Sequence, residues 1–560
     1  MFRATLHPKD PMTIRPRILA ALAFAHAALL ALPLALPSLA SAQQTAAAAP
    51  AAAPAAPPAC PIDMQMPSQL ALANLQRSKL ASATKAEDAH KTMLDAAKLL
   101  LDPKTAANPM GRDYMLAQML SLVIPFGGEI QPRAAVGFPG AGTLDLAVVV
   151  DSLLTIVEKG NPACKAEIGE WRQYKPYVLD VQSAYRTMGT DKADSAEYYA
   201  KRALIFSKEG AQPYDVLWRV AQKKNDEAGM LTNMKIAADK LVGDTANTAV
   251  RINLLFNMGR VLQDGAEKKA DPAKLESYKA SVEPFMMVLK EAPLSEEAPF
   301  ALQGIATAAT MAKNEGLVDA ALAVIKANPL KFSDVTLAQA GVQSTRMNRN
   351  AEAASFFESA MKVNPYSRDY MYNYAAMLYE SKRGSEMLPV VRNLVKLDPS
   401  NSDNVMLFAY AYKLFGDSVE ANFVKPAAKD STAAWAKATT LAAKKALKFD
   451  SLKTVRAEYK RLIDLVTTYS ELSDAMMQQL TYTQFDKYKD KTILKGQILN
   501  KAKAARSFTV DFEFLGKDGA VIEKKSVTVA DVKPDGTGSF SVEIAKGDVL
   551  GVRYAPLANK

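Results

Sequence analysis

Apolar positions in the second half of the chain follow two helical runs separated by a short polar stretch. In residues 351–365, AEAASFFESAMKVNP, small and large apolar residues recur three and four positions apart, a spacing that places them on one face of a helix. A comparable run precedes the polar turn at 348–350, where a break between helices is favoured. The pattern predicts a pair of packed helices over 334–347 and 351–363.

The predicted pair has small residues where its two helices should touch and one large aromatic residue between them. Small side chains let helix backbones approach closely, and a proline cannot continue a helix, so it ends the second one. The residues expected to form this packing, together with the prolines that close this unit and the next, are Gly341, Ala353, Phe357, Ala360, Pro365 and Pro399.

Runs that end in a proline recur at a nearly constant interval. The endings EAP, ANP, VNP and LDP place prolines 36, 36 and 34 residues apart, and further helical runs follow, as in 367–381 and 402–416. One helix pair cannot bury its apolar face alone, so this period predicts hairpins stacked into a solenoid. We expect the array over 170–450 and terminal or capping helices over 451–490.

This spacing of small residues, aromatic residue and proline resembles the tetratricopeptide repeat, a helix–turn–helix unit of about 34 residues. In that family, first-helix side chains line a concave groove that binds extended peptides or partner helices. The groove residues that the resemblance implies in this chain are Arg346, Tyr372, Tyr379, Met406, Tyr410 and Lys413. The same tyrosines could instead pack at helix crossings, whereas Tyr374 and Leu378 fall on the packing side and are expected in the core.

The last seventy residues change from helical spacing to alternation of period two. Apolar and polar side chains alternate over 508–514, and turns of the Asp-Gly type follow at 517–519 and 534–536. Alternation with tight turns predicts short strands, and hence a small antiparallel β-sandwich over 491–560. The segment resembles the FxLYD-type immunoglobulin-like domains of bacterial envelope proteins, although the tyrosine-aspartate pair of that motif is missing after Leu515.

The first sixty residues have the pattern of an export leader followed by a tether. Residues 1–42 combine basic residues, a long apolar run and an Ala-Ser-Ala cleavage site, as in a signal peptide; an uncleaved membrane anchor is the alternative. Residues 43–60 are mostly Ala and Pro and predict an extended tether. We therefore expect an exported protein, periplasmic or associated with the outer envelope.

The chain offers few residues for redox, metal or nucleophile chemistry. Cys60 and Cys164 are its only cysteines, and in an oxidising compartment they are predicted to form an intramolecular disulfide. His90 is the only histidine beyond the leader. A metal site and a Cys/His catalytic arrangement are therefore both disfavoured, and no cofactor is expected.

Residues 61–169 are predicted to form a helical N-terminal region that contains an apolar segment rich in Gly and Pro. Its GFPGAG sequence lacks the Gly-Lys-Ser/Thr ending through which a phosphate loop meets its ligand. The segment 121–160 is therefore either a buried loop that leads into a core helix or a loop that touches a partner or a membrane.

Charge and composition limit the possible functions. The net charge of +10 over 560 residues is not concentrated in a stripe, which disfavours nucleic-acid binding. The carboxylates form no recognisable catalytic motif, so the protein is not expected to be an enzyme. The sequence predicts a mostly α, non-catalytic scaffold for a protein or peptide partner, with no membrane span after leader removal. The alternatives are a structural or assembly component of a cell-envelope machine and, less favoured, an envelope enzyme with an unrecognised site.

Overall fold

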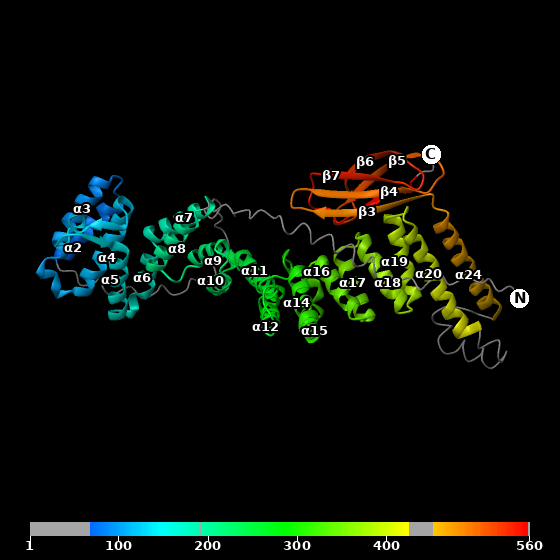
Figure 1. Cartoon of the computed structure of the whole chain (residues 1–560), viewed down its shortest axis with the longest axis horizontal. Coiled ribbons are helices and arrows are strands. Elements are labelled where there is room, and N and C mark those ends of the chain that lie inside the picture. The colour runs from blue at the N-terminus through cyan, green and yellow to red at the C-terminus, as the bar shows by residue number, and fades with distance from the viewer. Residues whose placement is uncertain (1–67, 191, 425–451, 558–560) are drawn as a thin grey trace. The chain divides into compact units, whose positions relative to one another are not determined.

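The computed structural model describes residues 68–190, 192–424 and 452–557. They divide into two compact units, with the boundary between Val288 and Leu289. We call residues 68–288 the N-terminal unit and residues 289–557 the C-terminal unit (Figure 1). The boundary falls within helix α13 (Val282–Glu291).

The N-terminal unit is built mainly from helical hairpins. Its helices are α2 (Ser68–Ala81), α3 (Ala86–Leu100), α4 (Pro109–Gly127), α5 (Leu146–Gly160), α6 (Lys165–Arg172), α7 (Lys175–Gly189), α8 (Ala193–Phe206), α9 (Gln212–Lys223), α10 (Glu227–Lys240), α11 (Thr248–Ala266) and α12 (Ala273–Ala280). A two-stranded antiparallel sheet, β1 (Ile130–Pro132) and β2 (Thr143–Asp145), connects α4 to α5. From α7 to α12 each helix contacts the next, so stacked hairpins begin well before the proline-spaced repeats.

Helix α4 forms the centre of the core of this unit. It is apolar on nearly all sides, which is typical of a helix surrounded by protein, and Met119, Leu120 and Val123 are fully buried. The glycine-rich segment after α4 also begins against the core. Gly137 has a φ of +78°, and a Cβ at that position would lie 2.4 Å from the Cβ of Ala97 on α3. A close backbone approach therefore explains this glycine.

Arg202 of α8 lies in a buried cluster of carboxyl groups. Its Nη1 and Nη2 donate to the two carboxylate oxygens of Asp145 at 2.5 and 2.6 Å, and its Nε donates to Glu129. A third carboxyl, that of Asp180 on α7, is only 7% exposed, and its Oδ2 accepts no hydrogen bond from a described residue. Burial, and then the neighbouring carboxyl of Glu129, raise the pKa of Asp180 to about 9. Asp180 therefore keeps its proton at neutral pH.

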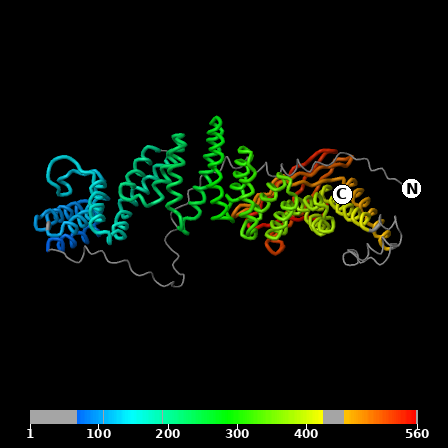
Figure 2. The backbone as a smooth tube through the Cα atoms, turned by 90° about the horizontal axis from the view of Figure 1, so that it is seen from below, coloured from blue at the N-terminus to red at the C-terminus, as the bar shows by residue number. Residues whose placement is uncertain are grey.

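The described residues of the C-terminal unit form a helical array and six strands. Its helices are α14 (Ala298–Ala312), α15 (Gly316–Ala327), α16 (Asp334–Arg346), α17 (Asn350–Val363), α18 (Arg368–Glu380), α19 (Gly384–Leu397), α20 (Ser402–Val419) and α24 (Leu452–Asp474). Figure 2 shows the helices up to α20 as successive hairpins side by side. The strands are β3 (Gln478–Lys487), β4 (Thr492–Asn500), β5 (Arg506–Leu515), β6 (Val521–Val532), β7 (Thr537–Ile544) and β8 (Gly551–Tyr554). The predicted fold class, a mostly α hairpin solenoid followed by a small antiparallel β domain, is confirmed.

Helices α16 and α17 pack through the small residues and the aromatic residue that their spacing singles out. Ala353, Phe357 and Ala360 are fully buried in α17. A Cβ added to Gly341 of α16 would lie 2.8 Å from the ring of Phe357, closer than such atoms approach in proteins. The absence of a side chain at this position lets the aromatic ring lie directly on the α16 backbone.

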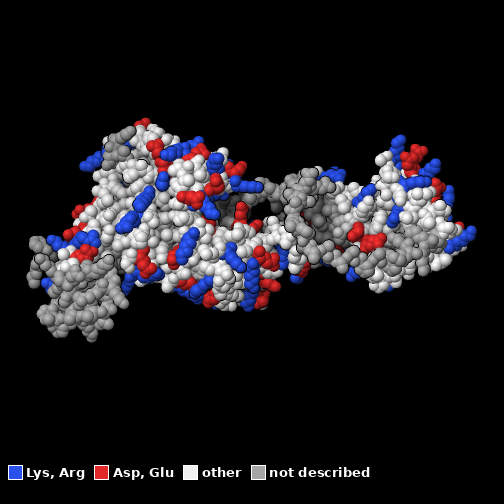
Figure 3. Space-filling view, turned by 180° about the vertical axis from the view of Figure 1, so that it is seen from behind, with Lys and Arg blue, Asp and Glu red and all other residues white. Residues whose placement is uncertain are grey.

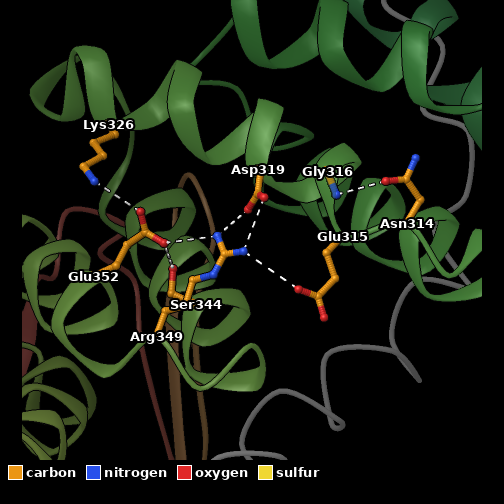
Figure 4. Close-up of polar contacts among 8 residues, drawn as sticks. All are labelled: Asn314, Glu315, Gly316, Asp319, Lys326, Ser344, Arg349 and Glu352. Atoms are coloured by element: carbon orange, nitrogen blue, oxygen red, sulfur yellow. Dashed lines mark hydrogen bonds and ion pairs between the residues drawn. The ribbon is translucent and has the colours of Figure 1, made fainter.

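The turn between α16 and α17 also connects this helix pair to the preceding one. Arg349 donates to both carboxylate oxygens of Asp319 on α15, and its guanidinium lies 3.8 Å from the carboxylates of Glu315 and Glu352 (Figure 4). These side chains are partly exposed, so the ion pairs contribute little to stability. The apolar contacts beneath them hold the pair together.

Replacing Ala360 with leucine is expected to destabilise the C-terminal unit by about 1–3 kcal/mol, because the site is full and the added carbons must displace a neighbour. Urea unfolding of the full chain measures the change. Asn350→Ala at the first residue of α17 is the matched control, since Asn350 is partly exposed and lies in the turn. Equally small effects for both variants would contradict the close packing of α16 and α17.

Two three-stranded sheets, ordered β3-β4-β7 and β6-β5-β8, form the β-sandwich. Alternate side chains of β5 fill the space between them, and Phe512 and Phe514 are fully buried. Gly519 and Asp535 have positive φ, as the two predicted hairpin turns require. The alternating pattern of the sequence therefore predicts the core face of β5, and the Asp-Gly pairs predict the turns.

One predicted boundary is wrong. Strand β3 begins at Gln478, inside the range 451–490 that the sequence assigns to helices. A β-bulge between Tyr482 and Gln484 shifts the register of β3 against β4. The bulge breaks the alternation of buried and exposed side chains, so the signal by which a strand is recognised is weak here.

Candidate interaction surface

The β-sandwich packs on the turns that end two of the helix pairs (Figure 1). In the first of these turns, Asn364 donates from Nδ2 to the backbone carbonyl of Leu550 at 3.1 Å. In the same turn, Tyr366 lies very close to Gly551. A Cβ added to Gly551 would be 2.3 Å from the carbonyl oxygen of Tyr366. Leu515 at the end of β5 is buried in the same apolar cluster as α16 to α20. The end of β5 is therefore part of the core of the array, while the β-sandwich has a separate core of its own.

Asp398 is the centre of the second docking turn and is only 1% exposed. Its Oδ2 accepts from Arg368 Nη1 at 2.8 Å and from Asn404 Nδ2 at 2.9 Å, while its Oδ1 accepts from the phenol of Tyr554 on β8. A buried carboxylate is tolerated only when cations and donors surround it. Here the array supplies the cation and the β-sandwich supplies a hydroxyl group.

Backbone hydrogen bonds and an aromatic contact complete this docking site. The carbonyl of Ser400 accepts from the N–H of Leu480 at 2.9 Å, and the hydroxyl of Ser400 accepts from the N–H of Leu557 at 2.9 Å. The guanidinium carbon of Arg368 lies 4.0 Å from the centre of the Tyr482 ring. Burial, followed by the charge of Asp398, raises the pKa of Tyr482 well above its usual value, so this phenol stays neutral.

Sequence reasoning does not find this docking site, although the sequence contains a signal for it. Asn364 and Asp398 both immediately precede the periodic prolines. Each forms a side-chain hydrogen bond with the residue 30 positions earlier, Asn364 with Asp334 at 3.0 Å and Asp398 with Arg368 at 2.8 Å. The two pairs occupy equivalent repeat positions, but only the second contains a full positive and a full negative charge.

The first helices of the repeats are α14, α16, α18 and α20, and they form the second candidate surface. Direct contacts join α14 to α16 and α18 to α20, across the helix that lies between them in sequence. We call the partly exposed side chains of these four helices the first-helix surface. The predicted groove residues belong to it: Arg346, Tyr372, Tyr379, Met406, Tyr410 and Lys413.

The structure brings two of these predicted residues into contact. The ring centroids of Tyr379 and Tyr410 are 5.3 Å apart with their planes tilted by 45°. Both side chains are partly buried and pack on the apolar cluster of the array, as does Tyr372. Burial, and then the neighbouring Tyr379, raise the pKa of Tyr410. The tyrosines therefore pack on the core of the array and remain partly exposed at its surface. Tyr374 and Leu378 lie in the core.

The two predicted cations of this surface are exposed. Arg346 lies at the end of α16, and Lys413 forms an ion pair with Asp417 one turn later on α20, at 2.6 Å. Met406 is partly buried, one turn before Tyr410. Among the described residues, no contact joins Arg346 of α16 to Lys413 of α20.

A group of three glutamines on the same helices is missed by sequence reasoning. Gln339 and Gln343 of α16 both donate from Nε2 to Oε1 of Gln303 on α14, at 2.5 and 3.0 Å. Both donors are almost fully buried. Gln303 and Gln339 are 36 residues apart, which is the proline interval of that part of the chain, so the repeat period could have indicated the pair. The first-helix surface therefore has a polar, hydrogen-bonded base between α14 and α16.

The remaining predictions about sites concern residues that are not part of the two surfaces described above. The leader at 1–42, the tether at 43–60 and Cys60 lie outside the described residues, while Cys164 is fully buried. Within the described parts of the chain, no group of three or more acidic, His or Cys residues could hold a metal ion. No helix in those parts is both long and apolar enough to cross a bilayer. Figure 3 shows basic and acidic side chains intermixed on the face in view.

Comparison with known proteins gives similarity to solved structures only. No family model and no curated protein matches the chain. A tetratricopeptide repeat protein of Thermus thermophilus is 14% identical, with a TM-score of 0.21, over 36% of this chain and 98% of its own. One from Parabacteroides merdae is 16% identical, with a TM-score of 0.23, over 52% and 99%. PilF of Pseudomonas aeruginosa is 14% identical, with a TM-score of 0.19, over 51% and 96%.

Proposed function

We propose that this protein is an exported, non-catalytic scaffold that binds a protein or peptide partner on the first-helix surface. The observation that carries the proposal is the contact between Tyr379 and Tyr410, two rings from neighbouring first helices that remain partly exposed. Because the core beneath them already restricts both rings, these two side chains lose little conformational entropy when a partner covers them. Aromatic side chains of this kind dominate binding energy when they are fully covered.

Two exposed cations on the same first helices favour a partner that carries carboxylates. Arg346 and Lys413 are exposed, and the existing partner of Lys413, Asp417, is itself half-exposed. An ion pair within one helix at the surface contributes only about 0.3–0.5 kcal/mol. Lys413 can therefore exchange Asp417 for an acidic side chain or a free C-terminus at small cost.

Export is the part of the proposal that rests on the leader pattern of residues 1–42 and the Ala/Pro-rich segment at 43–60. A signal peptide followed by an Ala/Pro-rich tether is the arrangement of a protein that acts outside the cytoplasm. In that setting a scaffold meets envelope proteins, which supply the acidic and apolar segments that the first-helix surface would accept.

Reversing both charges, with Arg346→Glu and Lys413→Glu, is expected to weaken capture of the native partner about tenfold, which is roughly 1.4 kcal/mol. Stability should change by less than about 0.5 kcal/mol, because both side chains are exposed. Replacing a tyrosine would be less informative, since Tyr379 and Tyr410 also pack on the core. Pull-down from an envelope extract with quantitative mass spectrometry measures capture.

The matched control reverses two exposed lysines on second helices, Lys362 of α17 and Lys396 of α19, with Lys362→Glu and Lys396→Glu. It makes the same change in net charge on a different side of each hairpin. Selective loss of one protein with the first variant supports the proposal. Equal loss with both variants, or no loss with either, would place partner binding elsewhere.

A further inference from the structure

A pocket in the N-terminal unit is separate from the proposed partner surface. It has a volume of about 390 Å³ and lies where α2, α4 and the end of α6 meet, next to the segment that joins α6 to α7. Apolar carbons of Ala81 and Leu122 form part of its wall, and the rings of Trp171 and Tyr174 form another, with centroids 5.0 Å apart. Its volume is in the range of small-molecule sites.

Opposite charges line this pocket without neutralising each other. Arg77 projects from α2 and Glu170 from α6. Among the described residues, Arg77 has no carboxylate within ion-pair distance and Glu170 has no cation. A cation and an anion in one small pocket suit a ligand that carries both charges.

A buried glutamine holds Arg77 in place. Nη1 of Arg77 donates to Oε1 of Gln118 at 2.5 Å, and Gln118 is 1% exposed. Because Arg77 can only donate, this bond sets the orientation of the amide, and Nε2 is left buried without a partner among the described residues. An unpaired buried donor costs about 1–3 kcal/mol, and costs of this kind are typical of functional sites. A neutral amide also leaves the charge of Arg77 available to an anion.

We propose that this pocket binds a small zwitterion of amino-acid size with an aromatic or large apolar side chain. Its carboxylate would pair with Arg77 and its ammonium group with Glu170, while its side chain lies on the rings of Trp171 and Tyr174. The aromatic wall favours a planar or bulky apolar group. This inference is independent of the proposed partner surface, which lies in the other unit.

Isothermal titration of the full chain with three related probes tests the proposal. L-phenylalanine carries both charges, N-acetyl-L-phenylalanine lacks the ammonium group, and L-phenylalaninamide lacks the carboxylate. We expect L-phenylalanine to bind with a dissociation constant below about 1 mM, and each of the other two probes to bind at least tenfold more weakly. Absence of L-phenylalanine binding at that level, or equal binding of all three probes, would overturn the proposal.

Three variants assign the contacts. Arg77→Gln should abolish the preference for L-phenylalanine over its amide, and Glu170→Gln should abolish the preference over the N-acetyl form. Arg112→Gln on α4 is the control, because Arg112 pairs with Asp113 and does not line the pocket. It should leave all three affinities unchanged. If both pocket variants keep the preferences of the parent protein while their melting curves match it, the assignment of Arg77 and Glu170 is wrong.

Discussion

Replacing Asp398 with alanine is expected to destabilise the C-terminal unit by about 3–5 kcal/mol and to release the β-sandwich from the array. The variant leaves the guanidinium of Arg368 and the phenol of Tyr554 without the carboxylate that both contact. Removing one partner of a buried ion pair is among the most costly single substitutions, because the remaining charge stays out of water. The effect should therefore far exceed the loss of one hydrogen bond.

Hydrogen exchange gives a local readout of this effect. The amides of Leu480 and Leu557 bond to Ser400 in the docking turn, so both should exchange faster in Asp398→Ala. Asp417→Ala, which breaks only the half-exposed pair with Lys413, is the control and should cost less than about 0.5 kcal/mol. The double variant Arg368→Met with Asp398→Leu should recover part of the stability, since it leaves no buried charge unpaired. Unchanged exchange in Asp398→Ala would mean that other contacts hold the β-sandwich.

Replacing Asp180 with asparagine is expected to stabilise the N-terminal unit at alkaline pH. The raised pKa of Asp180, about 9, means that the folded protein keeps a proton which the unfolded chain releases near pH 4. Between these values the unfolded state binds fewer protons, so the stability contributed by this group falls as pH rises. Through this group the free energy of unfolding falls by at most about 1.4 kcal/mol per pH unit, or about 4 kcal/mol from pH 5 to pH 8.

An asparagine at position 180 is neutral at every pH and can still donate to Glu129. The stability difference between Asp180→Asn and the parent protein should therefore be small at pH 5 and grow steadily toward pH 8. Urea unfolding at several pH values measures it. Asp194→Asn, at a strongly exposed position on α8 of the same unit, should give a curve parallel to the parent. Parallel curves for Asp180→Asn as well would show that the folded protein does not retain the proton.

The sequence by itself determines the local architecture, because local architecture depends on short-range spacing. Apolar residues that recur three and four positions apart predict α16 and α17, with ends within a few residues of those in the structure. The buried Ala353, Phe357 and Ala360 follow from the same pattern. Alternation of period two likewise gives the core face of β5. These features need no knowledge of which distant segments meet, since one face of each element is apolar whatever covers it.

Only the tertiary structure decides which elements meet and what their polar residues do. Asp398 appears in the sequence as an ordinary acidic residue in a turn, and it becomes the centre of a domain junction because Tyr554, 156 positions later, lies against it. Asp180 gains its raised pKa only when folding removes it from water and brings Glu129 beside it. The pocket side chains Arg77 and Glu170 come from helices α2 and α6, which are far apart in the sequence. Burial and charge interactions act through space, so the identity of a residue leaves its role open until its neighbours are fixed.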